Sequence, residues 1–158
     1  MIFLIDSDAL IHAFRYDFPP DGDHGDFWDW IRDPDNEHQI LICDKVMEEI
    51  ERGDDGLYHI LTALPGIRRE NIASALPHLS NVLAAYGEMD DVDMETLDRK
   101  ADPYLIAHAI GLQATVVTNE VPRPGITTPV SKKIPDICSV IGVPCVRYPR
   151  FLWNMGRE

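Results

Sequence analysis

Short apolar runs alternate with helix-like stretches along this chain. The first run, residues 1–5, is continuous and leads into Asp6, Ser7 and Asp8, as is typical of a buried parallel strand with polar residues at its carboxyl end. Strands that alternate with helices predict the α/β class, with a central, mainly parallel sheet flanked by helices. Similar apolar runs recur at residues 39–43, 114–117 and 143–148.

Helices are predicted between these strands from apolar spacing and capping residues. Asp26 and Asp44 are placed to cap helices, Gly53 and Gly111 to end them, and Asp102-Pro103 to start one. We therefore expect helices near residues 9–14, 27–31, 45–52, 57–64, 70–86, 102–110 and 135–141, with Pro77 ending or kinking the stretch at 70–86. The other segments are expected to be a loop at 16–26, an acidic stretch at 89–95, a polar loop at 127–133 and a terminal turn at 151–153.

The size of the chain suits one domain. Its 158 residues, 45% of them hydrophobic, predict a single domain over 1–158 in which residues 55–90 form a helical arm. The cysteines Cys43, Cys138 and Cys145 lie among apolar neighbours without a Cys-x-x-Cys pair, which favours buried, reduced thiols. The opening run is too short for a signal peptide or a membrane span, so we expect a cytoplasmic protein with no membrane association.

The formal net charge of −13 disfavours binding to nucleic acid or to an anionic membrane. It does not exclude a nuclease, because a bound cation cancels negative charge locally and basic pairs can still contact phosphates. Each adjacent basic pair is equally typical of a solvated surface. The candidates for substrate contacts are Lys132 and Lys133, Arg68 and Arg69, and Arg99 and Lys100.

Acidic side chains stand at the carboxyl ends of two expected strands, where parallel α/β sheets gather their functional groups. Asp6 and Asp8 follow the first strand, and Asn119 and Glu120 follow the run at 114–117. Converging carboxylates repel one another, so such an arrangement favours a bound divalent cation such as Mg²⁺ or Mn²⁺. This kind of site suits phosphodiester hydrolysis with a metal-activated water as the nucleophile.

Two further acids are expected beside these strands, and each also has a simpler explanation. Asp102 starts a helix and is equally well explained as a helix cap. Glu49 lies on the helix after the second strand, where Glu48 is an equal candidate by position alone. Asp8 is also placed to cap the first helix.

Four segments, in chain order, resemble the PIN domains, which include the VapC-type toxin ribonucleases. They are Ile5-Asp-Ser-Asp8, Val46-Met-Glu-Glu-Ile50, Ala101-Asp-Pro-Tyr-Leu-Ile-Ala107 and Val117-Thr-Asn-Glu120, and the resemblance spans residues 1 to about 148. Two other elements, Phe27–Trp30 and Lys133–Cys138, are similar to those of one PIN-like branch. The resemblance implies a three-layer PIN-like fold.

The resemblance also implies a metal-dependent endoribonuclease. Its register selects Glu49 over Glu48. Glu120 stands where many relatives have Asp, and Asp8 stands where Asn or Ser is more usual. We expect the longer side chain of Glu120 to shift the metal geometry. The catalytic residues, which would hold one or two Mg²⁺ or Mn²⁺ ions, are Asp6, Glu49, Asp102 and Glu120. The accessory candidates are Asp8, Asn119 and Asp136, of which Asp136 also suits a helix cap.

The leading hypothesis is therefore the toxin of a toxin–antitoxin pair, which cleaves RNA and is inhibited by an antitoxin protein. Apolar residues in the helical arm also suggest a homodimer. The alternative is a PIN-like binding or regulatory module with weak or no catalysis, which the net charge favours and the intact set of four acids disfavours. A phosphatase or receiver-type domain is disfavoured because Lys132-Lys133 follows a loop rather than a strand.

Aromatic residues and histidines are expected to have structural roles. Phe27, Trp28 and Trp30 have helical spacing, which favours packing over stacking on nucleic-acid bases. His108 lies on an apolar helix, and no His-Glu-x-x-His motif is present, so a packed histidine is expected rather than a zinc ligand.

Overall fold

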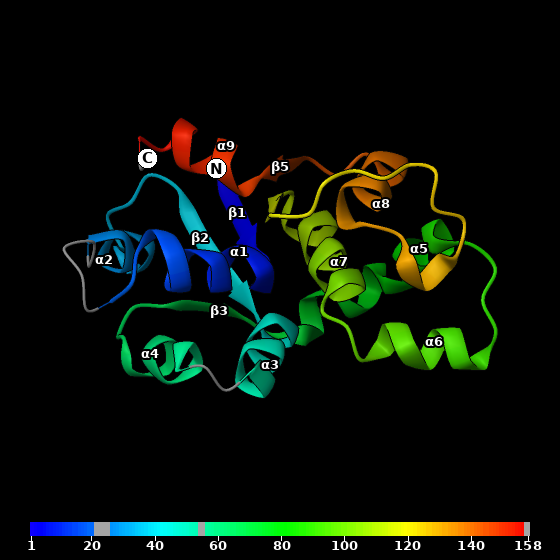
Figure 1. Ribbon diagram of the computed structural model, residues 1–158, viewed down its shortest axis with the longest axis horizontal. Coiled ribbons are helices and arrows are strands. Elements are labelled where there is room, and N and C mark those ends of the chain that lie inside the picture. Colours follow the sequence, from blue (N-terminus) through cyan, green and yellow to red (C-terminus); the bar gives the residue numbers. More distant parts are fainter. Residues whose placement is uncertain (21–25, 54–55, 157–158) are drawn as a thin grey trace.

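The computed structural model describes residues 1–20, 26–53 and 56–156 (Figure 1). Within these ranges five strands form one sheet in the order β3-β2-β1-β4-β5, and every neighbouring pair is parallel. The predicted α/β class with a central parallel sheet is therefore confirmed. The strands are β1 (Ile2–Ile5), β2 (Gln39–Cys43), β3 (Arg68–Glu70), β4 (Thr115–Thr118) and β5 (Cys145–Arg147).

Helices cover both faces of this sheet. On one face α7 packs on β1 and β4, and α5 and α8 pack on α7; in Figure 1 these helices gather on one side of the molecule. On the other face α1 contacts β4, and α9 contacts β4 and β5. The helices are α1 (Ser7–His12), α2 (Asp26–Arg32), α3 (Asp44–Gly53), α4 (Leu57–Ala63), α5 (Leu79–Tyr86), α6 (Asp91–Asp98), α7 (Asp102–Leu112), α8 (Ile134–Ile141) and α9 (Tyr148–Asn154).

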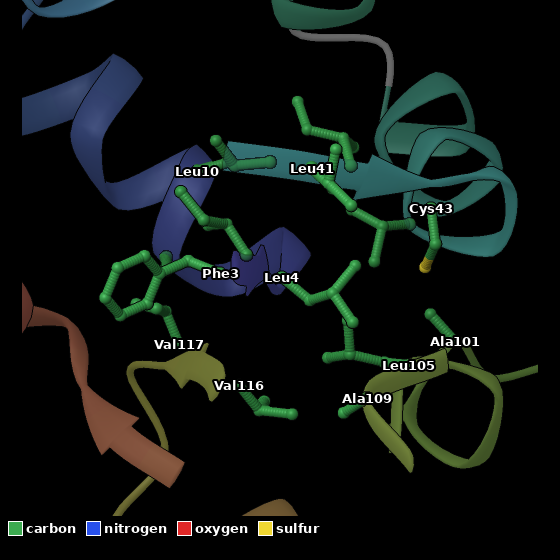
Figure 2. Close-up of a cluster of buried hydrophobic side chains, with 14 of the residues drawn as sticks. Phe3, Leu4, Leu10, Leu41, Cys43, Ala101, Leu105, Ala109, Val116 and Val117 are labelled. Carbon is green, nitrogen blue, oxygen red and sulfur yellow. The ribbon is translucent and has the colours of Figure 1, made fainter. Parts of the chain in front are cut away.

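The central strand β1 is buried on both faces, which explains its continuous apolar sequence. Figure 2 shows Leu4 beside Leu105 of α7, and both side chains are fully buried. On the opposite face the ring of Phe3 meets that of Phe151 in α9 edge to face, with 5.1 Å between centroids. Burying one such side chain contributes about 1.5–3 kcal/mol. Sliding β1 along the sheet would lose this burial, so the core holds the end of β1 in place.

Strand β3 was not predicted. The helical stretch at residues 70–86, which Pro77 was expected to end or kink, is α-helical only after this proline. Arg68 to Glu70 pairs with β2 through the backbone alone, and its polar side chains give no apolar alternation to detect. The Asn71 side chain then accepts a hydrogen bond from the N–H of Ala73 at 2.8 Å, which starts a short 3₁₀ turn instead of an α-helix. Only Leu79–Tyr86 is α-helical, so the expected helical arm also supplies an edge strand.

Gly111 was expected to end its helix, and it does not. Helix α7 continues to Leu112, and Gln113 takes the left-handed conformation at φ +52°. A Cβ on Gly111 would lie 3.1 Å from the ring of His78 and 3.3 Å from the carbonyl oxygen of Ser74. The glycine is therefore explained by close packing of another segment on the helix.

Other helix boundaries also differ from expectation. Asp26 and Asp44 are the first residues of α2 and α3 and not the residues before them, and Gly53 is the last residue of α3. Part of the expected 16–26 loop continues α1 as a π-helical segment over Ala13–Asp17, while residues 21–25 lie outside the described ranges. The acidic stretch forms α6, capped by Asp90, and the expected terminal turn is helix α9.

Several expectations about packing are confirmed. Phe27 and Trp28 are buried, and His108 is fully buried with its Nδ1 at 2.9 Å from the Ser74 Oγ. Cys43 and Cys138 are buried free thiols, whereas Cys145 is only partly buried. No helix in the described part of the chain is long and apolar enough to cross a membrane.

Candidate functional site

Asp6 lies at the carboxyl end of β1 and is 3% exposed. Its Oδ1 accepts a hydrogen bond from the N–H of Ser7 at 2.8 Å, so Asp6 caps α1. The Thr118 hydroxyl, at the end of the neighbouring strand β4, donates to Asp6 Oδ2 at 3.1 Å. The carboxylate is thus oriented from both central strands.

Asp8 makes a second connection between the end of β1 and the end of β4, in addition to that of Asp6 with Thr118. Its Oδ1 accepts a hydrogen bond from the backbone N–H of Asn119 at 3.1 Å. Asp8 was also placed to cap α1, but Asp6 has that role. The contact of Asn119 with this cluster is made by its backbone.

Glu49 projects from α3 towards the start of α1. The Ser7 hydroxyl donates to Glu49 Oε2, and the N–H of Ala101 donates to Glu49 Oε1, each at 2.6 Å. Glu48 instead forms an ion pair with Lys45 at 3.7 Å on the surface of α3. Glu49 therefore points into the acidic cluster, whereas Glu48, its neighbour on the same helix, points to the surface.

Asp102 is the first residue of α7, and no side-chain cap precedes it. Burial, followed by the charges of Glu120 and Glu49, raises the pKa of Asp102 to about 7. Its position at a helix N-terminus favours the charged form only modestly. Asp102 therefore holds a proton in part of the population near neutral pH.

Glu120 lies just beyond β4, next to the N-terminus of α8. Its Oε2 accepts a hydrogen bond from the N–H of Ile134 at 2.8 Å. Burial raises the pKa of Glu120, although this hydrogen bond and the nearby Lys133 and Lys100 act in the opposite direction. The charge of Asp8 adds to the increase.

The carboxylates from these separate segments act on one another electrostatically. Burial raises the pKa of Asp6 well above its ordinary value, and the charges of Asp8, Asp102 and Glu49 raise it further. Glu120 enters the same group through its effect on Asp102. The structure thus brings together the four acids expected from the sequence, with Asp8 as a fifth.

The chemistry of this donor set fits a hard divalent cation, because carboxylate oxygens are preferred by Mg²⁺ and Mn²⁺ and a cation would relieve their repulsion. Across residues 1–20, 26–53 and 56–156, no three Asp, Glu, His or Cys side chains are already arranged to hold a metal ion together. Both oxygens of Glu49 and one of Glu120 instead accept hydrogen bonds from the protein. Each of these oxygens keeps a second lone pair, so such a hydrogen bond orients the carboxylate without preventing it from binding a cation.

Sequence reasoning missed Tyr86, at the C-terminal end of α5. Its hydroxyl is buried and has no hydrogen-bond partner in the described part of the chain. Burial raises its pKa, and the charge of Asp102 is the next cause. Its sequence signal is only that of a tyrosine at the end of an apolar helix. Ser7 and Thr118, which orient the acids, were likewise not chosen.

The basic candidates divide into two groups. Lys133 and Lys100 act electrostatically on Glu120, and Lys132 lies beside Gly87, the neighbour of Tyr86. Lys100 also donates a hydrogen bond to the Val130 carbonyl at 2.9 Å. The other three lie in contacts elsewhere: Arg68 donates to the Asp33 carbonyl, Arg69 pairs with Asp44 and Arg99 pairs with Glu95.

Asp136, in the first turn of α8, makes a contact away from the acidic cluster. Its Oδ2 accepts a hydrogen bond from the backbone N–H of Arg123 at 2.8 Å. This bond joins α8 to the loop after β4. Its geometry gives Asp136 a role in holding that loop.

The model of the family described as "Domain of unknown function (DUF4411)" matches residues 3–157. This chain belongs to the DUF4411 family. A search of curated proteins found no match to it. The DUF4411 chain is similar in structure to a chain in the crystal structure of VapBC2 from Rickettsia felis bound to a DNA fragment from their promoter, with a TM-score of 0.57 and 14% identity over 93% of this chain and 98% of that one. At this identity the likeness shows a shared fold, and it supports the PIN-like fold implied by the sequence motifs.

Proposed function

We propose that this protein is a divalent-metal-dependent endoribonuclease and the toxin of a toxin–antitoxin pair. The observation that carries the proposal is the convergence of carboxylates from β1, α3, α7 and the end of β4, whose charges raise the pKa values of Asp6 and Asp102. Keeping such acids together costs stability unless a cation neutralises them, and clusters with perturbed pKa values are typical of functional sites.

Asp6, Glu49, Asp102 and Glu120 would hold Mg²⁺ or Mn²⁺. Such an ion, when bound, neutralises the acids, polarises a phosphate and lowers the pKa of water. Because Asp102 has a pKa of about 7, it must lose a proton before it serves as a ligand. We therefore expect metal affinity to rise with pH through neutrality.

Residues around the acids would position them and the substrate. The hydroxyls of Ser7 and Thr118 hold Glu49 and Asp6 in place. Lys133 and Lys100 supply positive charge close to Glu120, which partly offsets the net charge of −13 where a phosphate would approach. The antitoxin is proposed by analogy with VapBC2, and it would have to cover this edge of the sheet to inhibit the enzyme.

A second candidate function is a PIN-like binding or regulatory module without turnover. The net charge of −13 favours it, because the averaged field repels RNA. A module of this kind would retain the fold and would not cleave RNA with any divalent ion.

The deciding experiment is incubation of the pure protein with total RNA, with Mn²⁺ or with a chelator, and analysis on a denaturing gel. We expect Mn²⁺-dependent cleavage that Asp6→Asn removes and that Asp91→Asn, an exposed change on α6, leaves intact. Cleavage by Asp6→Asn at the wild-type rate, or no cleavage by either protein, would contradict the proposal. Hydrolysis of a phosphomonoester with no RNA cleavage would indicate a phosphatase.

A further inference from the structure

A cavity of about 520 Å³ lies between the end of α1 and the start of α9, separate from the acidic cluster. His12, Tyr16 and Asp17 line it from the α1 side, and Tyr148 and Leu152 line it from α9. Its volume is within the range of small-ligand sites, roughly 300–1,000 Å³. None of its lining residues belongs to the proposed metal site.

The chain departs from regular α-helix where it forms this cavity. Residues Ala13–Asp17 make a π-helical segment, closed by a hydrogen bond from the N–H of Phe18 to the Ala13 carbonyl at 2.7 Å. Such segments are rare in proteins, and those that do occur often lie at functional sites. This one carries both Tyr16 and Asp17, and Tyr16 is 69% exposed, which is unusual for a large aromatic side chain.

The polar group of the cavity is the Asp17 carboxylate. The Tyr148 hydroxyl donates to Asp17 Oδ2 at 2.8 Å, and His12 Nε2 lies 3.6 Å from the same oxygen. No described residue donates to Oδ1. The His12 ring lies 5.0 Å from the ring of Tyr16 and 5.7 Å from that of Tyr148, measured between centroids. The cavity therefore combines aromatic surfaces with an oriented acceptor.

The cavity adjoins the edge of the sheet that carries the acids. Tyr148 directly follows Arg147, which is in register with Thr118, and Thr118 donates to Asp6. His12 lies on the helix that begins at Ser7, about 8 Å further along its axis at 1.5 Å per residue. Arg147 itself is exposed, so its guanidinium group is accessible to a phosphate.

We propose that this cavity binds a guanine base of the RNA substrate, next to the phosphate that is cleaved; this substrate assignment rests on the proposed function. Guanine presents two adjacent donors, N1–H and the N2 amino group, to a carboxylate. Adenine and cytosine place an acceptor beside their amino group, and uracil places its one N–H between two carbonyls. Asp17 is thus matched to guanine, and Tyr16 supplies a stacking surface.

An arginine side chain from a partner protein is the alternative occupant, because its guanidinium group also presents adjacent N–H donors. It is a poorer match to this cavity. A guanidinium group has only four heavy atoms, so it would leave most of the 520 Å³ unfilled. A guanine base has more heavy atoms than a guanidinium group and fills more of this space, and its nucleotide also carries a phosphate that the exposed Arg147 could contact. The observations therefore favour the base.

The test is calorimetric titration in chelator with the 3′-monophosphates of guanosine, adenosine, cytidine and uridine, so that neither metal nor cleavage is needed. We expect the guanosine nucleotide to bind at least about tenfold more tightly than the others, a difference of about 1.4 kcal/mol. Asp17→Asn should remove this preference while its side-chain oxygen still accepts from Tyr148. Tyr16→Ala should weaken all four nucleotides by about tenfold through lost stacking. Asp91→Asn is the control and should bind like the wild type.

Equal binding of the four nucleotides, or unchanged preference in Asp17→Asn, would overturn the proposal. Tighter binding of N-acetylarginine amide than of the guanosine nucleotide would overturn it in favour of a partner peptide. If the RNA assay shows cleavage, cuts beside guanines support the assignment, and cuts without base preference refute it. Because the titration needs no turnover, a failed RNA assay and a failed base site are separate results.

Discussion

The backbone N–H of Ala101 donates a hydrogen bond to the Glu49 carboxylate, with 2.6 Å between the nitrogen and Oε1. Ala101 directly precedes Asp102, so this bond sets the start of α7 against α3. The other oxygen of Glu49 accepts from Ser7, the residue after Asp6. One side chain therefore connects the segments that carry two other acids of the cluster.

Glu49→Gln is expected to abolish Mn²⁺-dependent RNA cleavage with a loss of at least about a hundredfold, because a neutral amide is a poor ligand for a hard cation. The fold should survive, since the glutamine oxygen still accepts from Ala101. Glu48→Gln is the matched control on the same helix turn and should retain activity, because Glu48 faces Lys45. Equal loss in both variants would contradict the distinction. Cleavage rates and circular dichroism check both statements.

Asp102→Asn is expected to stabilise the metal-free protein at high pH. The pKa of Asp102 rises from 3.8 to about 7 on folding, so its contribution to stability is fully present below about pH 4 and is lost as the pH rises through about 7. The variant should therefore gain at most about 4 kcal/mol over the wild type above about pH 8. Urea denaturation of the two proteins below about pH 4 and above about pH 8 measures this difference in the free energy of unfolding. A gain that is the same at low pH would show a cause other than ionisation.

Tyr86→Phe is expected to raise the free energy of unfolding by about 1 kcal/mol, because it removes a buried hydroxyl that has no partner in the described residues. Tyr148→Phe is the contrasting variant and should lower it by about 1 kcal/mol, since its hydroxyl donates to Asp17. Chemical denaturation compares the two. Destabilisation by Tyr86→Phe would show that the hydroxyl has a partner, such as a buried water.

Gly111→Ala is expected to lower the free energy of unfolding by about 1–3 kcal/mol, since the new methyl group would lie 3.1 Å from His78. Gly53→Ala, at the end of α3, meets nothing within 4 Å and should be neutral or slightly stabilising. Thermal unfolding of the two variants provides the measurement. A neutral Gly111→Ala would mean that the segment around His78 moves freely away from α7.

The sequence predicted four of the described strands because each is an apolar run, and a strand covered on both faces needs no alternation. It did not predict β3, since Arg68, Arg69 and Glu70 pair at the edge of the sheet by backbone hydrogen bonds that any side chains allow. The end of α7 was placed too early because Gly111 serves close packing, a tertiary effect that local patterns do not contain.

At the site, strand ends and a helix start indicated Asp6, Glu120 and Asp102, because parallel strands place their carboxyl ends at one edge. Glu49 lies inside α3 and was selected over Glu48 only through the resemblance to PIN domains. The residues that orient them could not be selected. Thr118 and Ser7 are ordinary strand and helix residues, respectively, until the fold brings their hydroxyls to Asp6 and Glu49. Tyr86 depends on the packing of α5 on α7 and α8, which the sequence does not reveal.

The strand order has a consequence for protein synthesis. The middle strand of the sheet is made first, and the Thr118 hydroxyl that orients Asp6 comes 112 residues later. At about 5–20 residues per second, a ribosome takes several seconds to cover that interval. Under the proposed function, a nascent chain therefore cannot attack its own messenger before Thr118 has been made and has reached Asp6.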